Sequence, residues 1–145
     1  MRLETEQDGS HEVSTAQELE AALMAIEPQR NSFAILTAEE EVYLQTAADR
    51  EGFVVERRDG SAQSHAKAMR TTLHPTWPQD RFDRAEMIAI FTAYLTGQKS
   101  PAGVRWEPLK MAYVSATPKR FGRLLPIAVV AILLICALAI PLALW

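Results

Sequence analysis

The run FAILTAEEEVYLQTAADREGFVVERRDG, residues 33–60, decides the fold because it holds three strand candidates separated by short turns. Residues 32–37 are apolar on both sides, which predicts a central strand, and residues 42–47 alternate in polarity, which predicts a half-buried strand. Residues 53–58 form the third candidate, and Asp59-Gly60 after them is the strongest hairpin dipeptide in the chain. Such short connections predict an antiparallel meander rather than a doubly wound sheet.

A helix is predicted before this run. It begins at a capping box that either Ser14 with Gln17 or Thr15 with Glu18 can form. Apolar residues follow at the spacing of one buried helical face, and Pro28 ends the segment.

A second helix is predicted after the run. Its capping box is Asp83-x-x-Glu86, and Phe82 and Met87 occupy the positions of a hydrophobic staple. The apolar face that follows is broad enough to cover a sheet, and Gly97 suits the C-terminal cap.

Two further segments extend the predicted sheet. Residues 62–69 are more polar and predict an edge strand, and residues 104–107 predict one more short strand. At the start of the chain, residues 1–13 predict a loose or strand-like lead. The predicted fold class is therefore α+β. We expect a four- to five-stranded, mostly antiparallel sheet with two helices on one face, followed by one C-terminal transmembrane helix.

A membrane anchor is predicted after a cytoplasmic α+β domain that spans residues 1–108. Residues 109–123 are a basic linker, and residues 124–145 (LLPIAVVAILLICALAIPLALW) contain no charged or amide side chain. A helix of this length reaches about 33 Å, which matches a hydrocarbon core of about 30 Å. The residues that we assign to the predicted membrane anchor include Leu124, Leu125, Pro126, Leu134 and Trp145.

The orientation follows from Lys119, Arg120 and Arg123, which directly precede the predicted span. The positive-inside rule keeps these residues and the domain before them in the cytoplasm. We therefore expect a single-pass protein of the bacterial inner membrane, in contact with lipid.

A stripe of mostly small residues in the predicted span would let a helix of an integral membrane partner approach closely. The stripe comprises Ala128, Ala131, Ile135, Ala139 and Ala143.

The sequence contains no motif that identifies a reaction. It has neither a GxxxxGK[ST] nor a GxGxxG run, and its single cysteine, Cys136, lies in the predicted span. We therefore expect no catalytic residue, no metal site and no cofactor. An enzyme is expected only if a pocket brings His65 or His74 against a carboxylate.

Five side chains are candidates for binding a protein partner. Glu39, Glu40 and Glu41 form an acidic turn, for which a plain solvated turn is the alternative. Trp77 and Trp106 lie where a large ring can anchor a partner, although core packing is the alternative for both. Nucleic acid is not expected as a partner, because no recognition motif accompanies the basic side chains, which are Arg57, Arg58, Lys67, Arg70, Arg81 and Arg84.

The charges are distributed unevenly along the chain, whose formal net charge is −3. Residues 1–56 are strongly acidic, and residues 57–123 are basic. Two arrangements are open at this point. The two halves interleave in the fold and neutralise one another, or they form an acidic side and a basic side, with the basic side nearer an anionic membrane surface.

Several segments resemble a known family. Together they are similar to the small bacterial domains grouped as Imm1-like immunity proteins. The segments are FAIL at 33–36, YLQTA at 43–47, GFVVERRDG at 52–60, FTAYLTG at 91–97 and Trp106-Glu107. The resemblance covers roughly residues 12–108. It implies binding and neutralisation of toxins from polymorphic secretion systems, often nucleic-acid deaminases.

Two functions are therefore predicted as alternatives. The first is a non-catalytic accessory or assembly subunit of a bacterial inner-membrane complex, whose domain binds a protein neighbour. The second is a membrane-tethered immunity protein, whose acidic turn and acidic first half imitate a nucleic-acid backbone and block a basic toxin cleft.

Overall fold

A computed structural model of the chain describes residues 1–73 and 77–109. These residues form seven strands, two α-helices and a short 3₁₀ helix. In chain order they are β1 (Arg2–Thr5), β2 (Gly9–Glu12), α1 (Ala16–Met24), β3 (Phe33–Glu39), β4 (Val42–Asp49), β5 (Gly52–Asp59), η1 (Ala62–Ser64), β6 (Ala66–Arg70), α2 (Arg84–Leu95) and β7 (Val104–Pro108).

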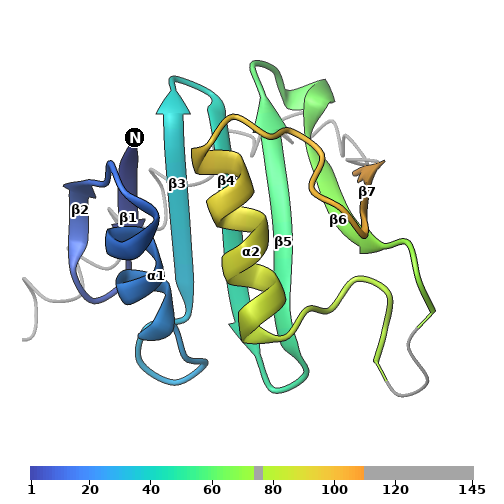
Figure 1. The fold of residues 1–145 in the computed structure, drawn as a ribbon, viewed down its shortest axis with the longest axis horizontal. Helices are drawn as coiled ribbons and strands as arrows, with labels where there is room; N and C mark the ends of the chain where they lie inside the picture. Colours follow the sequence, from blue (N-terminus) through green and yellow to red (C-terminus); the bar gives the residue numbers. More distant parts are fainter. Residues whose placement is uncertain (74–76, 110–145) are drawn as a thin grey trace, which may run out of the picture. The chain divides into compact units, whose positions relative to one another are not determined.

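The strands form one antiparallel sheet in the order β2-β1-β3-β4-β5-β6-β7, and both helices lie in front of it in Figure 1. The predicted α+β class, the antiparallel sheet and the two helices are confirmed. The predicted number of four to five strands is wrong, because residues 2–12 form a hairpin that extends the sheet beyond β3. All four residues of β2 are exposed, so this edge strand lacks the apolar pattern that marks a strand.

The meander predicted over residues 33–60 forms β3, β4 and β5. Its register pairs Ile35 with Gln45 and Gln45 with Glu56, so these three side chains lie in one row across the sheet. Asp59-Gly60 does not form the tight hairpin that its sequence suggests. The Ser64 hydroxyl instead accepts hydrogen bonds from two backbone N–H groups of a longer connection that contains η1.

The prediction that the strand near residues 62–69 is an edge strand is also wrong. The observed strand, β6, pairs with β5 only at Glu56 and Arg57, but it pairs with β7 along its whole length. The strand predicted at residues 104–107 is confirmed as β7, and this strand forms the edge of the sheet beyond β6.

Both predicted helices form at their predicted caps. The Thr15 hydroxyl accepts from the Glu18 backbone N–H, which selects this pair over Ser14 with Gln17 at the start of α1. The capping box Asp83-x-x-Glu86 starts α2. Gly97 has a φ of +82°, and bonds from Gly97 N–H to Tyr94 O and from Gln98 N–H to Ala93 O end α2 in a Schellman motif.

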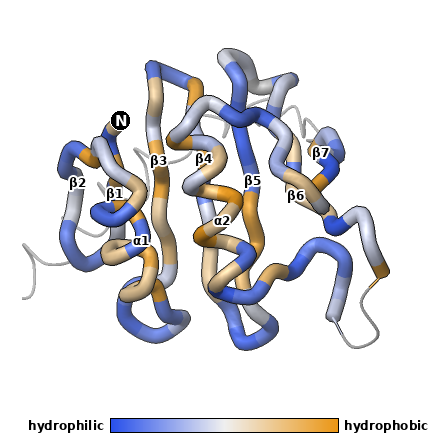
Figure 2. The backbone as a smooth tube through the Cα atoms, viewed as in Figure 1, coloured by the Kyte–Doolittle hydropathy of each residue, from blue (hydrophilic) through white to orange (hydrophobic). Residues whose placement is uncertain are grey.

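The hydrophobic core lies between the two helices and the face of the sheet that they cover. Figure 2 shows hydrophobic residues along β3, along α2 and on the first half of β5, whereas the second half of β5 is hydrophilic. Each large apolar side chain fully buried here stabilises the fold by about 1.5–3 kcal/mol. The largest buried apolar side chains are Leu3, Leu19, Leu23, Ile26, Leu36, Leu44, Phe82, Met87 and Phe91.

A cation joins the two helices. The Arg84 guanidinium, on the first turn of α2, donates hydrogen bonds to Leu23 O at 3.2 Å and to Met24 O at 2.8 Å. These carbonyls are at the C-terminal end of α1, where a positive charge offsets the helix dipole. The same guanidinium lies 5.2 Å from the centre of the Phe53 ring. Arg84 therefore connects both helices to β5.

The predicted membrane segment lies outside the described residues. This includes the linker from residue 110 onward with Lys119, Arg120 and Arg123, the span 124–145, and the small-residue stripe from Ala128 to Ala143. Within residues 1–73 and 77–109, no helix combines the length and the apolar character that crossing a membrane requires. The predicted span stays a prediction.

Gly52 is the position where the backbone most clearly requires glycine. Its φ is +119°, and a Cβ atom there would lie 2.7 Å from both Phe82 O and Trp77 Cζ3. The close approach allows Phe53 and Phe82 to exchange two backbone hydrogen bonds, of 2.9 and 3.0 Å. Gly52 therefore lets the segment before α2 lie against the start of β5.

We expect Gly52→Ala to destabilise the protein by about 2–4 kcal/mol, because the methyl group adds a steric clash to the cost of an unfavourable φ. Denaturant unfolding followed by tryptophan fluorescence measures this change. Gly60→Ala is the matched control: its φ is +87°, but no atom lies within 4 Å of the added Cβ. Equal losses for the two variants would show that the contact with Phe82 and Trp77 contributes nothing.

Candidate functional site

One face of the sheet is left uncovered by the described helices. We call it the open face. Side chains alternate along each strand, so that Ala34 and Leu36 of β3 are buried beneath the helices while Phe33 and Ile35 point to the opposite side and are only half-buried. Val54 on β5 is half-buried on the same side.

A groove of about 310 Å³ lies on the open face across β3, β4 and β5. The register brings its side chains together in two rows. The first row is Phe33, Ala47 and Val54, and the second is Ile35, Gln45 and Glu56. The groove is therefore apolar along most of its length and carries an amide and a carboxylate at one end. Thr46 completes its lining, but the Thr46 hydroxyl donates to Val54 O at 2.8 Å.

A polar cluster surrounds the carboxylate at that end. The Gln45 side-chain amide donates to Glu56 Oε2 at 2.8 Å, and His65 Nε2 lies 3.3 Å from the same oxygen. The two rings of Tyr43 and His65 meet edge to face with their centres 6.3 Å apart. His65 Nε2 is buried and makes no hydrogen bond of acceptable geometry with any described residue.

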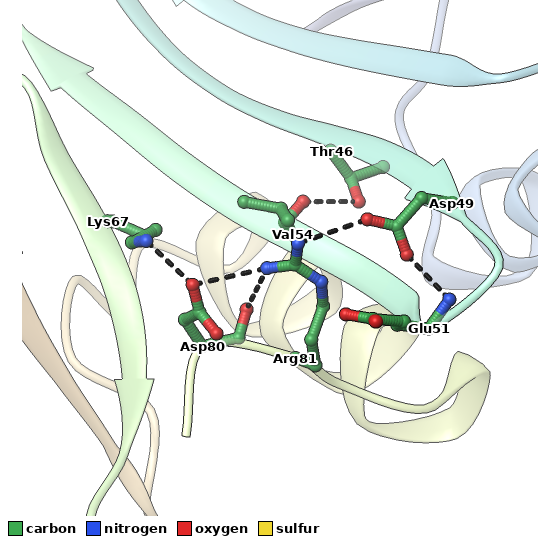
Figure 3. A network of polar contacts seen from close by, with 7 residues as sticks. All are labelled: Thr46, Asp49, Glu51, Val54, Lys67, Asp80 and Arg81. Atoms are coloured by element: carbon green, nitrogen blue, oxygen red, sulfur yellow. Dashed lines mark hydrogen bonds and ion pairs between the residues drawn. The ribbon is translucent and has the colours of Figure 1, made fainter. Parts of the chain in front are cut away.

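A second polar network runs from β6 through the segment before α2 to the turn between β4 and β5, and Figure 3 shows its members. The Lys67 ammonium donates to Asp80 Oδ2 at 2.7 Å, and Arg81 bridges Asp80 and Asp49 at 3.1 Å each. Asp49 also accepts from the Glu51 backbone N–H at 2.7 Å. The hydrogen bond from Lys67, assisted by the charges of Lys67 and Arg81, holds the pKa of the Asp80 carboxyl below its ordinary value despite partial burial.

The predicted acidic turn forms, but its three carboxylates differ in their surroundings. Glu39 is the last residue of β3, Glu40 lies in the turn, and Glu41 has a φ of +63°. All three residues are exposed. Glu41 pairs with Arg58 at 2.9 Å, so it is tied to β5, whereas Glu39 and Glu40 make no ion pair within the described residues.

The two predicted tryptophan anchors both pack within the fold. The Trp106 indole donates to Lys99 O at 3.0 Å and lies 4.5 Å from the Arg57 guanidinium, which also donates to Lys99 O. Trp77 is half-buried, contacts the Gly52 backbone, and lies 5.7 Å from the Arg70 guanidinium. Trp106 packs against the edge of the hydrophobic core, as the alternative interpretation predicts. Trp77 lies beside Gly52 and is not part of that core cluster.

His65 meets the condition set for an enzyme in one respect, because it lies against a carboxylate. Such a pair can orient an imidazole as a general base. Within the described residues, however, the groove offers no nucleophile, since its one hydroxyl, on Thr46, is bonded to Val54 O. His74 lies outside the described residues, and no group of three or more potential metal ligands occurs among those that are described. The absence of catalysis stays a prediction.

The acidic and basic halves of the chain interleave where β4 meets β5. Arg58 pairs with Glu41, and Arg81 pairs with Asp49, so two cations of the basic half neutralise two carboxylates of the acidic half. Arg84, also in the basic half, instead donates to neutral backbone carbonyls of α1. In the described residues, ion pairs within the fold thus neutralise part of the negative charge of the acidic half and part of the positive charge of the basic half.

The open-face residues Phe33, Ile35 and Val54 were not among the predicted site residues. The sequence contains a signal for Phe33 and Ile35, because residues 32–37 are apolar on both sides. Two helices on one face of a sheet cover only one of those sides. The apolar side chains of the other side therefore had to lie on the uncovered face.

Comparison with known proteins finds no family model, no curated protein and no solved structure that matches this chain. The resemblance to Imm1-like immunity proteins therefore stays a prediction that rests on the quoted segments. The open face and its groove are the features on which a functional proposal can stand.

We expect Lys67→Met to raise the pKa of Asp80 and to destabilise the protein by about 1 kcal/mol at pH 7. A depressed carboxyl pKa stabilises the fold above the ordinary value of about 3.9, and this contribution disappears as the pH falls through the lower pKa of the folded state. The difference between the two proteins should therefore shrink below about pH 4. Denaturant unfolding at pH 7 and pH 3, with carboxyl NMR titration of Asp80, measures both effects.

Lys99→Met is the matched control for this variant. Lys99 also pairs with an aspartate, Asp59, but at 3.4 Å and with most of its side chain exposed. Exposed pairs contribute little, so Lys99→Met should change stability by less than about 0.5 kcal/mol. An unchanged Asp80 titration in Lys67→Met would contradict the role given to Lys67.

Proposed function

We propose that this chain is a non-catalytic, membrane-anchored protein whose cytoplasmic domain binds a protein partner through the open face. The observation that carries the proposal is the apolar part of that face, where Phe33, Ile35 and Val54 lie together without cover from a described helix. Exposed apolar patches with polar surroundings mark interaction sites on soluble domains. The most concrete form of this role is an accessory or assembly subunit of a bacterial inner-membrane complex.

The arrangement around the patch supports a protein as the partner. Gln45, Glu56 and Arg58 border the apolar side chains on neighbouring strand positions. An apolar centre with a polar rim is the usual anatomy of a protein interface. A sheet face is also nearly flat, which suits another folded surface.

The second candidate is the membrane-tethered immunity protein. One observation favours it: Glu39 and Glu40 are exposed at the end of the same strands that carry the groove. Two free carboxylates beside an apolar patch would complement a toxin whose active cleft is basic. In both candidates the domain acts by binding, and they differ in the identity of the partner.

The open face is tested by co-purification of the full-length chain from mild detergent. We expect one protein to be recovered reproducibly with the natural chain, and Ile35→Lys or Val54→Lys to reduce its recovery by about tenfold or more, because a charge would be buried in the apolar centre of the interface. An integral membrane protein in the eluate supports the accessory subunit, and a toxin supports the immunity protein.

Met24→Lys serves as the control for these variants. Met24 is 55 % exposed on α1, on the opposite side of the sheet, so the same charge there should leave the recovery unchanged. A chain that always emerges alone, or equal losses for Met24→Lys and Ile35→Lys, would refute binding through the open face.

The anchor is tested by fractionation. We expect the full-length chain to stay in the membrane pellet through an alkaline carbonate wash, and a version cut after Lys110 to appear in the supernatant. Leu134→Arg should weaken retention, because an arginine near the centre of the span opposes insertion by about 3 kcal/mol. A full-length chain that remains dissolved and monomeric without detergent would refute the membrane assignment.

A further inference from the structure

Glu56, at the polar end of the groove, has no lysine or arginine within ion-pair distance among the described residues, and its one basic neighbour is the His65 imidazole, 3.3 Å from Oε2. Lys67 lies directly opposite Glu56 on β6, but its ammonium donates to Asp80 instead. The groups that contact the Glu56 carboxylate are the Gln45 amide and the His65 imidazole, and both lie against Oε2. Oε1 accepts no hydrogen bond from any described residue.

The path to this carboxylate is apolar. Ile35 and Gln45 lie in the same cross-strand row as Glu56, and Phe33, Ala47 and Val54 form the adjacent row. A ligand group that matches the groove therefore combines an apolar stem with a cationic head. Lysine and arginine side chains have this construction, since their methylene stems lie along apolar surface while the charge reaches a polar site. A guanidinium also offers several donors to one carboxylate.

We propose that the groove receives an arginine or lysine side chain of the protein partner, with Glu56 as its counter-charge. The stem lies between Ile35 and Val54, and the cationic head donates to the free Oε1 of Glu56. Gln45 and His65 are positioning residues, because their contacts with Oε2 hold the carboxylate at the end of the groove. This inference rests on the proposed function and adds the chemistry that the partner must present.

The test is an NMR titration of the ¹⁵N-labelled full-length chain in detergent micelles. One probe is N-acetyl-arginine amide, and the other is N-acetyl-citrulline amide, which has nearly the same length and shape but no charge. The arginine probe should shift the backbone amide signals of Gln45, Val54 and Glu56, and it should bind about fivefold more tightly than the citrulline probe. Glu56→Gln should reduce its affinity to that of citrulline.

Glu20→Gln is the matched variant, since it removes one exposed carboxylate from α1, on the opposite side of the sheet, and should leave the affinity for the arginine probe unchanged. The inference is overturned if the arginine probe causes no shifts at the groove, if both probes bind equally, or if Glu56→Gln binds arginine as the natural chain does. Equal losses in Glu56→Gln and Glu20→Gln would also overturn it, because they would indicate a general effect of net charge.

Co-purification separates a failure of this inference from a failure of the proposed function. If Glu56→Gln weakens recovery of the partner as Ile35→Lys does, the result supports the inference. If Ile35→Lys loses the partner and Glu56→Gln retains it fully, the basic side chain is refuted while binding through the open face stands. If both variants retain the partner, the proposed function fails as well.

Discussion

The alternation of side chains along β3, β4 and β5, combined with helices on one face only, is the constraint from which the other features of this protein follow. A strand must place half of its side chains on each face of the sheet. On β3 the helices bury Ala34 and Leu36, and Phe33 and Ile35 are directed to the other side. The strand is apolar on both faces, so the described helices bury one apolar surface and leave the second one uncovered.

The short ladder between β5 and β6 explains both the second polar network and the lack of contact between Glu56 and Lys67. These strands pair at only two positions, and the segment before α2 fills the gap beside them through the bonds between Phe53 and Phe82. Lys67 and Arg81 hold that segment through Asp80. The cation that faces Glu56 across the ladder is therefore used for folding, and the charge of Glu56 is left for the open face.

What could be predicted from the sequence was governed by local interactions. Features that depend on a few neighbouring residues formed as predicted. They are the capping boxes at Thr15 and Asp83, the Schellman motif at Gly97 and the alternation of β4. The exposed strand β2 escaped prediction because only its pairing with β1 makes it a strand. The groove escaped for a related reason: its rows arise from the register of three strands, and no single segment contains that information.

The contacts of the basic side chains bear on the class of partner that we propose for the domain. Arg57 and Arg58 are adjacent in sequence but lie on opposite faces of β5, where Arg57 packs on Trp106 and Arg58 pairs with Glu41. Each of the other four basic side chains forms an ion pair with a carboxylate or donates hydrogen bonds to backbone carbonyls. These side chains are Lys67, Arg70, Arg81 and Arg84. A nucleic-acid surface needs cations that are free to contact phosphates. These six basic side chains hold strands, loops and helices of the domain together, whereas Oε1 of Glu56 in the groove accepts no hydrogen bond from a described residue. That pattern favours the proposal of a partner that carries positive charge on a protein surface.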